Sequence, residues 1–242
     1  MPDVPRSAMV LAAGLGTRMR PITDRMPKPL VPVGGKALVD HGLDALARAG
    51  VERAVVNVHH LADMLVEHLA ERHQPEIVVS DERDVLLDSG GGIANALPLL
   101  GDERFVTLNA DTFWLDAPGH DNIRALAAAW DPDRMDMLAL LADRREAIGH
   151  TGRGDFGFAR GAAGSLRWDA DGHVFAGASI VSPSIFRGDE PRAHSMRIHF
   201  DRMIESGRMH GIVLRGTWIT VGTPDAIATA ERAMRDHAAA PA

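Results

Sequence analysis

Three features that the sequence lacks narrow what this chain can be. It contains no cysteine, which excludes disulfides, thiolate metal ligands and a cysteine nucleophile. It has no apolar run close to the roughly 20 residues needed to cross a bilayer. The apolar stretch after its first seven residues is also too short for a signal-peptide core. We therefore expect a soluble, cytoplasmic protein without a membrane role.

A net positive charge is missing as well. The chain carries 26 Lys and Arg against 33 Asp and Glu, a formal net charge of −7. This balance argues against broad nucleic-acid binding, because a polyanion normally needs a basic face. The basic loop at residues 18–28 points instead to a small anionic ligand. We expect small-molecule partners and no nucleic acid, and the sequence leaves the oligomeric state open.

What the chain does contain is an alternation of short apolar and amphipathic segments. Residues 8–13 are typical of a buried strand, and residues 37–50 have helical apolar spacing and end on a C-capping glycine. Further strands are predicted at 53–58, 76–80 and 104–111, separated by helices at 61–72 and 86–101. Strand–helix alternation is typical of βαβ units. We predict an α/β fold with a Rossmann-like, mostly parallel sheet flanked by helices.

The second part of the chain continues the sheet and adds a smaller feature. Strands are predicted at 135–143 and 174–183, and a helix at 225–239. Residues 154–174 between the two strands are rich in turn formers and predict a β hairpin. We expect one domain over 1–242, with this hairpin as a small lobe.

The glycine-rich loop after the first strand suggests phosphate binding. Glycines let the backbone pass close to a ligand and offer amide N–H groups to oxygen anions. The segment Gly14 to Arg18 is neither a Walker A loop nor a Rossmann fingerprint, because Met19 stands where the latter needs glycine. Prolines around Arg18 and Lys28 stiffen the loop and hold both cations near one place. A solvated loop with incidental charge is the alternative.

The stretch "LAAGLGTRMRPITDRMPKPL" resembles the signature of nucleoside-diphosphate-sugar pyrophosphorylases, G-x-G-x-R-x-x-P-x-T-x-x-x-P-K-P. Every defined position of that pattern matches: Gly14, Gly16, Arg18, Pro21, Thr23, Pro27, Lys28 and Pro29. The resemblance extends to "VNVHHLAD", "LLDSGGGIANALPLLG", "LNAD", "GDF", "FAGASIVSP" and "VGTP". It therefore spans nearly the whole chain.

The resemblance implies an activity, nucleotidyl transfer from a nucleoside triphosphate to a sugar 1-phosphate with release of pyrophosphate. Among the subfamilies, the segments look most like short bacterial uridylyltransferases acting on N-acetylmuramate 1-phosphate in cell-wall recycling. Mannose-1-phosphate guanylyltransferases are the second choice. The family also implies Mg²⁺, a nucleotide-binding half over about 1–115 and a sugar-binding half over about 116–242.

Site residues carry over position by position from the same resemblance. Arg18 and Lys28 would be catalytic, and Asp111 would hold Mg²⁺. The nucleotide-binding set is Ala12, Ala13, Gly14, Gly16, Thr17, Arg18, Asp88, Gly90 and Gly91. The sugar-binding set is Asn109, Asp155 and Gly177.

One position departs from the family pattern. Relatives commonly read W-x-D-x-G-T-P near the C-terminus, with the Asp as second metal ligand, whereas this chain has Thr220 in that place. A hydroxyl binds Mg²⁺ more weakly than a carboxylate, although Mg²⁺ often relies on one carboxylate plus phosphates and waters. Three alternatives follow: Asp111 and the phosphates suffice, another acid substitutes, or the protein is an impaired enzyme or a nucleotide-binding regulator.

The histidines suggest other sites only weakly. His59 and His60 are adjacent and cannot readily share one metal ion, so we expect structural roles. His194, His199 and Asp201 could form a triad with a serine only on paper, because no G-x-S-x-G elbow occurs. We expect these three at the surface or against a partner helix.

Overall fold

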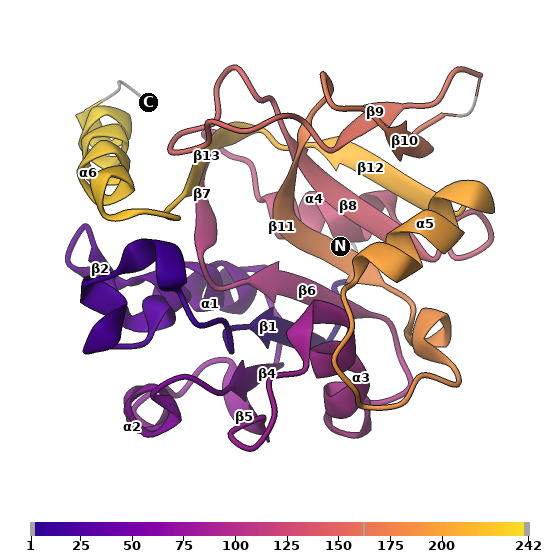
Figure 1. Cartoon of the computed structure of the whole chain (residues 1–242). Helices are drawn as coiled ribbons and strands as arrows, with labels where there is room; N and C mark the ends of the chain where they lie inside the picture. The colour runs from indigo at the N-terminus through magenta and orange to yellow at the C-terminus, as the bar shows by residue number, and fades with distance from the viewer. Residues whose placement is uncertain (1–2, 162, 240–242) are drawn as a thin grey trace.

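The computed structural model describes residues 3–161 and 163–239. Its centre is a seven-stranded sheet in the order β12-β8-β11-β6-β1-β4-β5 (Figure 1). Its strands are β1 (Ser7–Leu11), β4 (Arg53–Val58), β5 (Glu76–Asp81), β6 (Phe105–Asn109), β8 (Met137–Ala142), β11 (Val174–Val181) and β12 (Met209–Val213). β11 runs antiparallel to β6 and β8, and the other neighbours pair in parallel. The predicted α/β fold with a mostly parallel sheet is confirmed.

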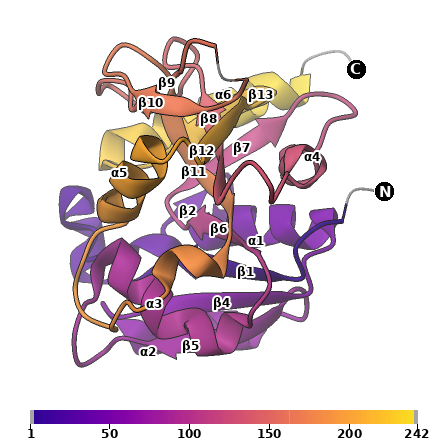
Figure 2. The ribbon, with the colours of Figure 1, turned by 90° about the vertical axis from the view of Figure 1, so that its right-hand side faces the viewer.

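Helices cover both faces of this sheet. Alternate residues of β1 face opposite ways: Ala8 and Val10 join one buried cluster, and Met9 joins another. The first cluster includes residues of α1 (Leu38–Ala49), α2 (Ala62–Ala70) and α4 (Asn122–Ala129), and the second those of α3 (Asp88–Leu100) and α5 (Arg197–Glu205). Figure 2 shows α4 and α5 on opposite sides of the sheet. The result is a three-layer α/β/α arrangement.

The C-terminal part of the chain returns to support the N-terminal loop. β13 (Gly216–Thr220) pairs antiparallel with β7 (Thr112–Asp116), and α6 (Pro224–Ala239) follows it. A third buried cluster joins Met19 and Val31 of the loop to Phe113, Ile219 and Ala230. Sequence analysis did not predict this strand pairing, because neither segment shows a strong alternating pattern. Its effect is to hold the basic loop against residues 200 positions away.

The remaining elements are short. The predicted hairpin is present as β9 (Phe156–Phe158) and β10 (Leu166–Trp168), which pair antiparallel. A second small hairpin joins β2 (Pro32–Val33) to β3 (Lys36–Ala37), and 3₁₀ turns occur at η1 (Thr17–Met19), η2 (Ile22–Asp24), η3 (Lys28–Leu30) and η4 (Pro183–Phe186). Three of these four turns lie between residues 17 and 30, so the basic loop has a regular backbone.

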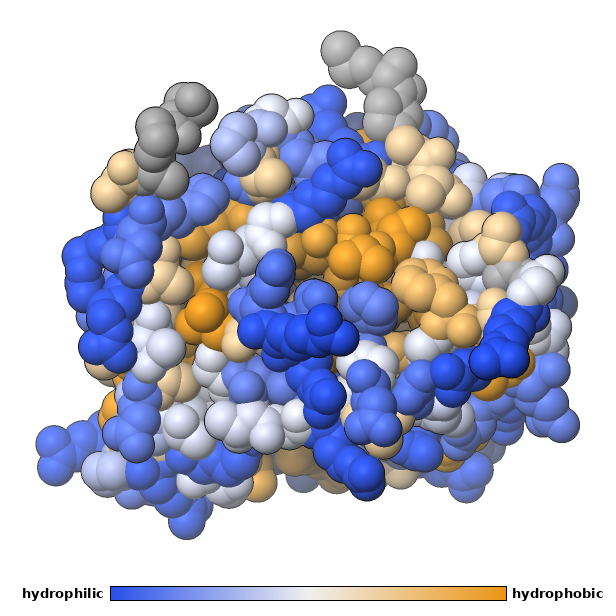
Figure 3. All heavy atoms as spheres, turned by 90° about the horizontal axis from the view of Figure 1, so that it is seen from above, coloured by the Kyte–Doolittle hydropathy of each residue, from blue (hydrophilic) through white to orange (hydrophobic). Residues whose placement is uncertain are grey.

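The surface seen from above in Figure 3 has hydrophilic side chains around its rim, with apolar atoms between α6 and the β9–β10 hairpin. Large exposed apolar side chains come from separate elements, among them Leu15, Val85, Phe158 and Ile198. In the described part of the chain, none of the helices has the length and apolar character required to span a membrane.

Candidate active site

A cavity of about 290 Å³ lies at the C-terminal ends of β1 and β6. The chain builds β4 and β5 on one side of β1 and then places β6 on the other, which makes this the topological switch point where α/β sheets bind ligands. The predicted residues among those that line it are Ala12, Ala13, Gly14, Lys28, Asp88, Asn109 and Asp111. We call it the loop-side cavity.

The basic loop is folded on itself by three residues of its motif. Gly16 has φ +63°, and a Cβ there would lie 2.9 Å from Thr23 Cγ2 and 3.0 Å from Lys28 Cβ. The Thr23 hydroxyl donates to the Gly16 carbonyl at 2.8 Å. Only glycine combines this left-handed backbone with so close an approach. The spacing of these motif residues therefore positions Lys28, and Gly16 and Thr17 do not themselves line the cavity.

Lys28 and Asp111 form the charged end of the cavity. Their side chains are 11% and 33% exposed, and Lys28 Nζ donates to Asp111 Oδ2 at 2.5 Å. Asp111 directly precedes β7, so the end of one strand and the start of the next fix its position. The pair puts a nearly buried ammonium and a carboxylate at one point of the cavity, where both can meet a phosphorylated ligand.

Arg18 lies apart from this pair. It is exposed, and its guanidinium would lie 3.6 Å from a Cβ on Gly222 in the "VGTP" turn. Thr220 is close to the same place: it pairs in register with Thr112, and the neighbouring Val221 N–H donates to the Asp111 carbonyl at 3.1 Å. The structure thus brings Arg18 and Thr220 to the same side of the domain as Asp111, although Arg18 does not line the loop-side cavity.

A buried polar network centred on Asn57, which also lines the cavity, was not predicted. Asn57 Oδ1 accepts hydrogen bonds from the Ala12 and Ala13 amides at 2.6 and 3.3 Å. Its Nδ2 donates at 2.7 Å to Glu82, which also accepts from the Leu87 amide at 3.0 Å. The amides of Ala12 and Ala13 are therefore already used. The signal in the sequence was an asparagine within the apolar strand "RAVVNV".

The glycine cluster at the start of α3 has a packing role. A Cβ on Gly91 would lie 2.1 Å from the Arg192 carbonyl oxygen, and one on Gly90 would lie 2.5 Å from the His194 ring. Both amides donate to the His194 carbonyl, at 2.9 and 3.0 Å. These glycines sit beneath residues 187–196, which we call the strap. Of the predicted α3 residues, Asp88 lines the loop-side cavity, whereas Gly90 and Gly91 face the strap.

A second cavity of about 320 Å³ adjoins the first and shares Leu11, Ser89 and Asn109 with it. We call it the strap-side cavity. Its wall is aromatic, and its lining includes Asp155, Phe156, Trp168, Phe175, Arg197 and Phe200. Two of the three predicted sugar-site residues, Asn109 and Asp155, are here. Sequence analysis missed the aromatic residues and Arg197, which come from separate elements and share no local motif.

The predicted sugar-side residues differ in what they contact. Asp155 Oδ2 accepts a hydrogen bond from the Phe175 amide at 2.9 Å, so it caps β11 as well as lining the cavity. Gly177 has φ +80°, and a Cβ there would lie 2.5 Å from Thr112 Oγ1 and 3.1 Å from Asn109 Cβ. Gly177 thus packs behind Asn109 rather than lining either cavity.

Of the histidine predictions, one agrees with the structure and one does not. His59 and His60 bond the carbonyls of Glu82 and Thr23, at 2.7 and 2.8 Å, which agrees with structural roles. For His199 the expectation was a position at the surface or against a partner helix, and the surface position is wrong: its side chain is 1% exposed and its ring packs against Phe186. Asp201 instead accepts a hydrogen bond from Trp168 Nε1 at 2.8 Å.

Comparison with known proteins adds to this geometry. Residues 7–141 match the family model described as nucleotidyl transferase. The chain is 44% identical, over 96% of its length and 98% of the relative's, to N-acetylmuramate alpha-1-phosphate uridylyltransferase of Caulobacter vibrioides. It is 27% identical to a mannose-1-phosphate guanyltransferase of Schizosaccharomyces pombe, over 90% of this chain and 61% of that protein.

A solved structure shows the same fold. The inositol-1-phosphate CTP transferase from T. maritima matches with a TM-score of 0.77 and 18% identity, covering 100% of both chains. At this identity the match concerns the fold alone. The central sheet and the helices on its faces therefore recur as a unit in a protein of very different sequence.

Proposed function

This chain belongs to the nucleotidyl transferase family as a sugar-1-phosphate nucleotidyltransferase, and we propose that its substrates are UTP and N-acetylmuramate 1-phosphate. The products would be UDP-N-acetylmuramate and pyrophosphate, and the reaction would serve the reuse of cell-wall sugars in the cytoplasm. The preference for uridine rests on the 44% identical relative. The preference for N-acetylmuramate rests on the strap-side cavity as well.

The observation that carries the choice of sugar is the position of Arg197. N-acetylmuramate differs from N-acetylglucosamine by a lactyl ether that ends in a carboxylate, and mannose has no carboxylate. Arg197 lines the strap-side cavity with its guanidinium 4.3 Å from the centre of the Trp168 ring. A guanidinium stacked on an aromatic ring is well suited to bind a carboxylate. The surrounding aromatic wall suits the apolar face of a sugar ring.

The two adjoining cavities support an in-line displacement. The triphosphate would occupy the loop-side cavity, where the Gly14 backbone and the Lys28 ammonium can meet phosphate oxygens. The sugar 1-phosphate would enter from the strap-side cavity, so that its phosphate oxygen attacks the α-phosphorus and pyrophosphate leaves. Such reactions depend on positioning and on neutralising charge. Lys28 would hold the attacking and the α-phosphate groups together, and Arg18 would neutralise the leaving pyrophosphate.

Mg²⁺ fits the residues that are present. The partly exposed Asp111 carboxylate stands at the cavity, and one carboxylate with phosphate oxygens and waters is a donor set that Mg²⁺ accepts. When bound, the ion would supply further neutralisation of phosphate charge. Asp111 would hold it and exchange its contact with Lys28 for the ion, which would free the ammonium for phosphate. Thr220, beside Asp111, would contribute at most a neutral oxygen.

A matrix of substrates tests the proposal. Pyrophosphate release is measured for the four nucleoside triphosphates against the 1-phosphates of N-acetylmuramate, N-acetylglucosamine and mannose, with Mg²⁺. We expect the highest kcat/KM for UTP with N-acetylmuramate 1-phosphate, about 10-fold above N-acetylglucosamine 1-phosphate, which lacks only the lactyl group. A preference for GTP with mannose 1-phosphate would overturn the substrate assignment. Silence over the whole matrix would favour the non-catalytic nucleotide-binding alternative.

A further inference from the structure

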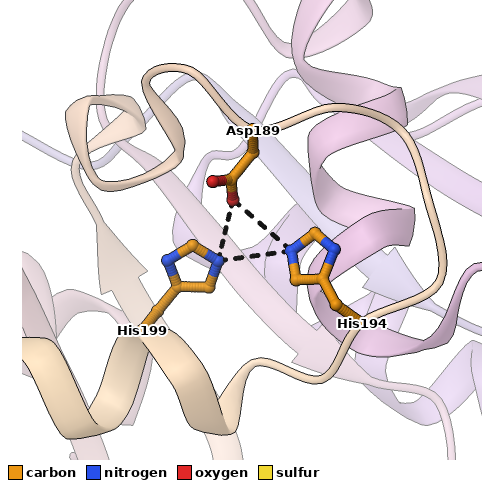
Figure 4. A group of neighbouring side chains, drawn as sticks. All are labelled: Asp189, His194 and His199. Atoms are coloured by element: carbon orange, nitrogen blue, oxygen red, sulfur yellow. Dashed lines mark hydrogen bonds and ion pairs between the residues drawn. The ribbon is translucent and has the colours of Figure 1, made fainter.

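Asp189, His194 and His199 form a cluster outside both cavities of the candidate active site. Asp189 and His194 belong to the strap, and His199 lies in the first turns of α5. Their side chains point toward one centre (Figure 4). Within residues 3–161 and 163–239, this is the only group of three or more His, Asp or Glu side chains with ligand atoms close enough to share one metal ion.

The separations of the three ligand atoms match a tetrahedral metal site. Asp189 Oδ2 lies 3.0 Å from His199 Nε2 and 3.4 Å from His194 Nε2, and the two Nε2 atoms lie 3.4 Å apart. Four ligands about 2.0 to 2.1 Å from a zinc ion at the corners of a tetrahedron are about 3.3 to 3.4 Å apart. An octahedral ion at about 2.1 Å would need about 3.0 Å throughout. Two of the three separations therefore equal the edge of such a tetrahedron, and the Asp189–His199 separation of 3.0 Å is shorter than that edge.

Hydrogen bonding orients His194 as a ligand. Its Nδ1 lies 2.8 Å from the Arg192 carbonyl oxygen. Because a carbonyl can only accept, Nδ1 carries the proton, and in the neutral ring the Nε2 lone pair faces the cluster. Metal-binding histidines typically donate their other ring N–H to a carbonyl in this way.

Burial sets the other two residues in place. The His199 side chain is 1% exposed, and its ring centroid lies 4.7 Å from that of Phe186. Among the described residues, Asp189 Oδ2 is a buried oxygen to which no group donates a hydrogen bond of acceptable geometry. A buried carboxylate oxygen without a donor is costly unless a cation compensates it. A cation bound where the three ligand atoms converge would compensate this oxygen.

The surroundings leave room for a fourth ligand. A cavity of about 290 Å³ opens beside the cluster and is lined by Gly188, Asp189, Glu190, Arg192, His194, Ile198, His199 and Arg202. This space gives an ion a path of entry and leaves the fourth corner of the tetrahedron to water or a small anion. Two nitrogens, one oxygen and no sulfur form a donor set that Zn²⁺ accepts.

We propose that Asp189, His194 and His199 bind one Zn²⁺ ion, which pins the strap to α5 and so fixes one wall of the strap-side cavity. Three hydrogen bonds couple the strap to that wall: the His194 carbonyl accepts from the amides of Gly90 and Gly91, and the Met196 amide donates to Ser89 Oγ at 3.0 Å. Ser89, Ser195 and Met196 line the cavity. The site is separate from Asp111, which lies at the loop-side cavity.

The test uses the full chain, stripped with a chelator and titrated with Zn²⁺ alone by calorimetry, with bound zinc counted by elemental analysis. We expect one equivalent per chain and a higher thermal midpoint with zinc. Substituting Co²⁺ should give the intense visible bands of a four-coordinate ion. Asp189→Asn and His194→Asn should each lose the equivalent and the midpoint shift. Both positions are partly exposed, which limits the risk of misfolding.

Two control variants separate this site from other histidines and from the active site. His237→Asn on α6 and Asp111→Asn should both keep the zinc equivalent. The proposal is overturned if the unaltered chain takes up no stoichiometric zinc, if Asp189→Asn and His194→Asn bind as much as His237→Asn, or if Asp111→Asn abolishes binding. None of these outcomes depends on nucleotidyl transfer, so the proposed function stands or falls separately.

Discussion

The loop-side and strap-side cavities adjoin each other but are built in different ways. The loop-side cavity takes most of its lining from the ends of β1 and β6 and from the motif loop. The strap-side cavity shares β1 and β6 with it but takes most of its lining from β8, β9, β10, β11, α3, α5 and the strap. A phosphate chain common to all nucleotides can be bound by one local motif. A particular sugar needs a wall assembled from many elements, and this is where relatives of one family can diverge.

The largest effect is expected from Lys28 on the loop side. Lys28→Ala removes the nearly buried ammonium beside Asp111 and should lower kcat/KM by about 10³-fold, equally for every sugar 1-phosphate. Steady-state pyrophosphate release measures it. Arg25→Ala, an exposed arginine of the same loop, is the matched control and should stay near the parent value. A loss confined to one sugar would contradict the division between the cavities.

Substitutions at two glycines, one at the loop-side cavity and one beneath the strap, should have different effects on stability and activity. A Cβ on Gly14 meets no atom within 4 Å, whereas one on Gly91 would lie 2.1 Å from the Arg192 carbonyl oxygen. Gly91→Ala should therefore lower the free energy of unfolding by about 2 kcal/mol. Gly14→Ala should leave it unchanged and reduce kcat/KM for UTP about 30-fold, because the methyl would enter the proposed phosphate site and displace the ligand. Denaturant unfolding and kinetics on both variants measure these effects, and an equal stability loss would contradict the assignment.

A smaller and more selective effect is expected on the strap side. Arg197→Ala should raise KM for N-acetylmuramate 1-phosphate about 10-fold, the cost of one charged hydrogen bond made by a largely exposed side chain. KM for N-acetylglucosamine 1-phosphate should not change, because that sugar has no carboxylate. The exposed Arg160 gives the matched control Arg160→Ala. An equal rise for both sugars would show that Arg197 does not read the lactyl group.

Much of the fold was predictable because its signals are local. The helix at 37–50 appears as α1, ending at Gly50 with φ 102°, and the strand–helix alternation produced the parallel part of the sheet. The β7–β13 pair was not predictable in the same way. It joins residues about 100 positions apart, and each strand is short. Which segments pair across such a separation depends on the packing of the whole domain.

The candidate site likewise contains residues that the sequence predicted and contacts that it could not predict. The family resemblance predicted Lys28 and Asp111 at one ligand site, and both residues line the loop-side cavity. The pattern could not reveal that Asn57 binds the amides of Ala12 and Ala13, or that Gly90 and Gly91 lie under the strap. Each of these contacts joins separate elements. A glycine read as a ligand contact can equally be the point where another backbone approaches.

What the sequence by itself determined is the fold class and the family, since hydrophobic period and motif spacing are properties of neighbouring residues. Only the tertiary structure decided which residues distant in the sequence come into contact. It joined Lys28 to Asp111, 83 positions away. It also lined the strap-side cavity with Arg197 and aromatic rings, and it turned Asp189, His194 and His199 toward one centre. Such contacts depend on how the helices pack on the sheet, and no local sequence pattern encodes them.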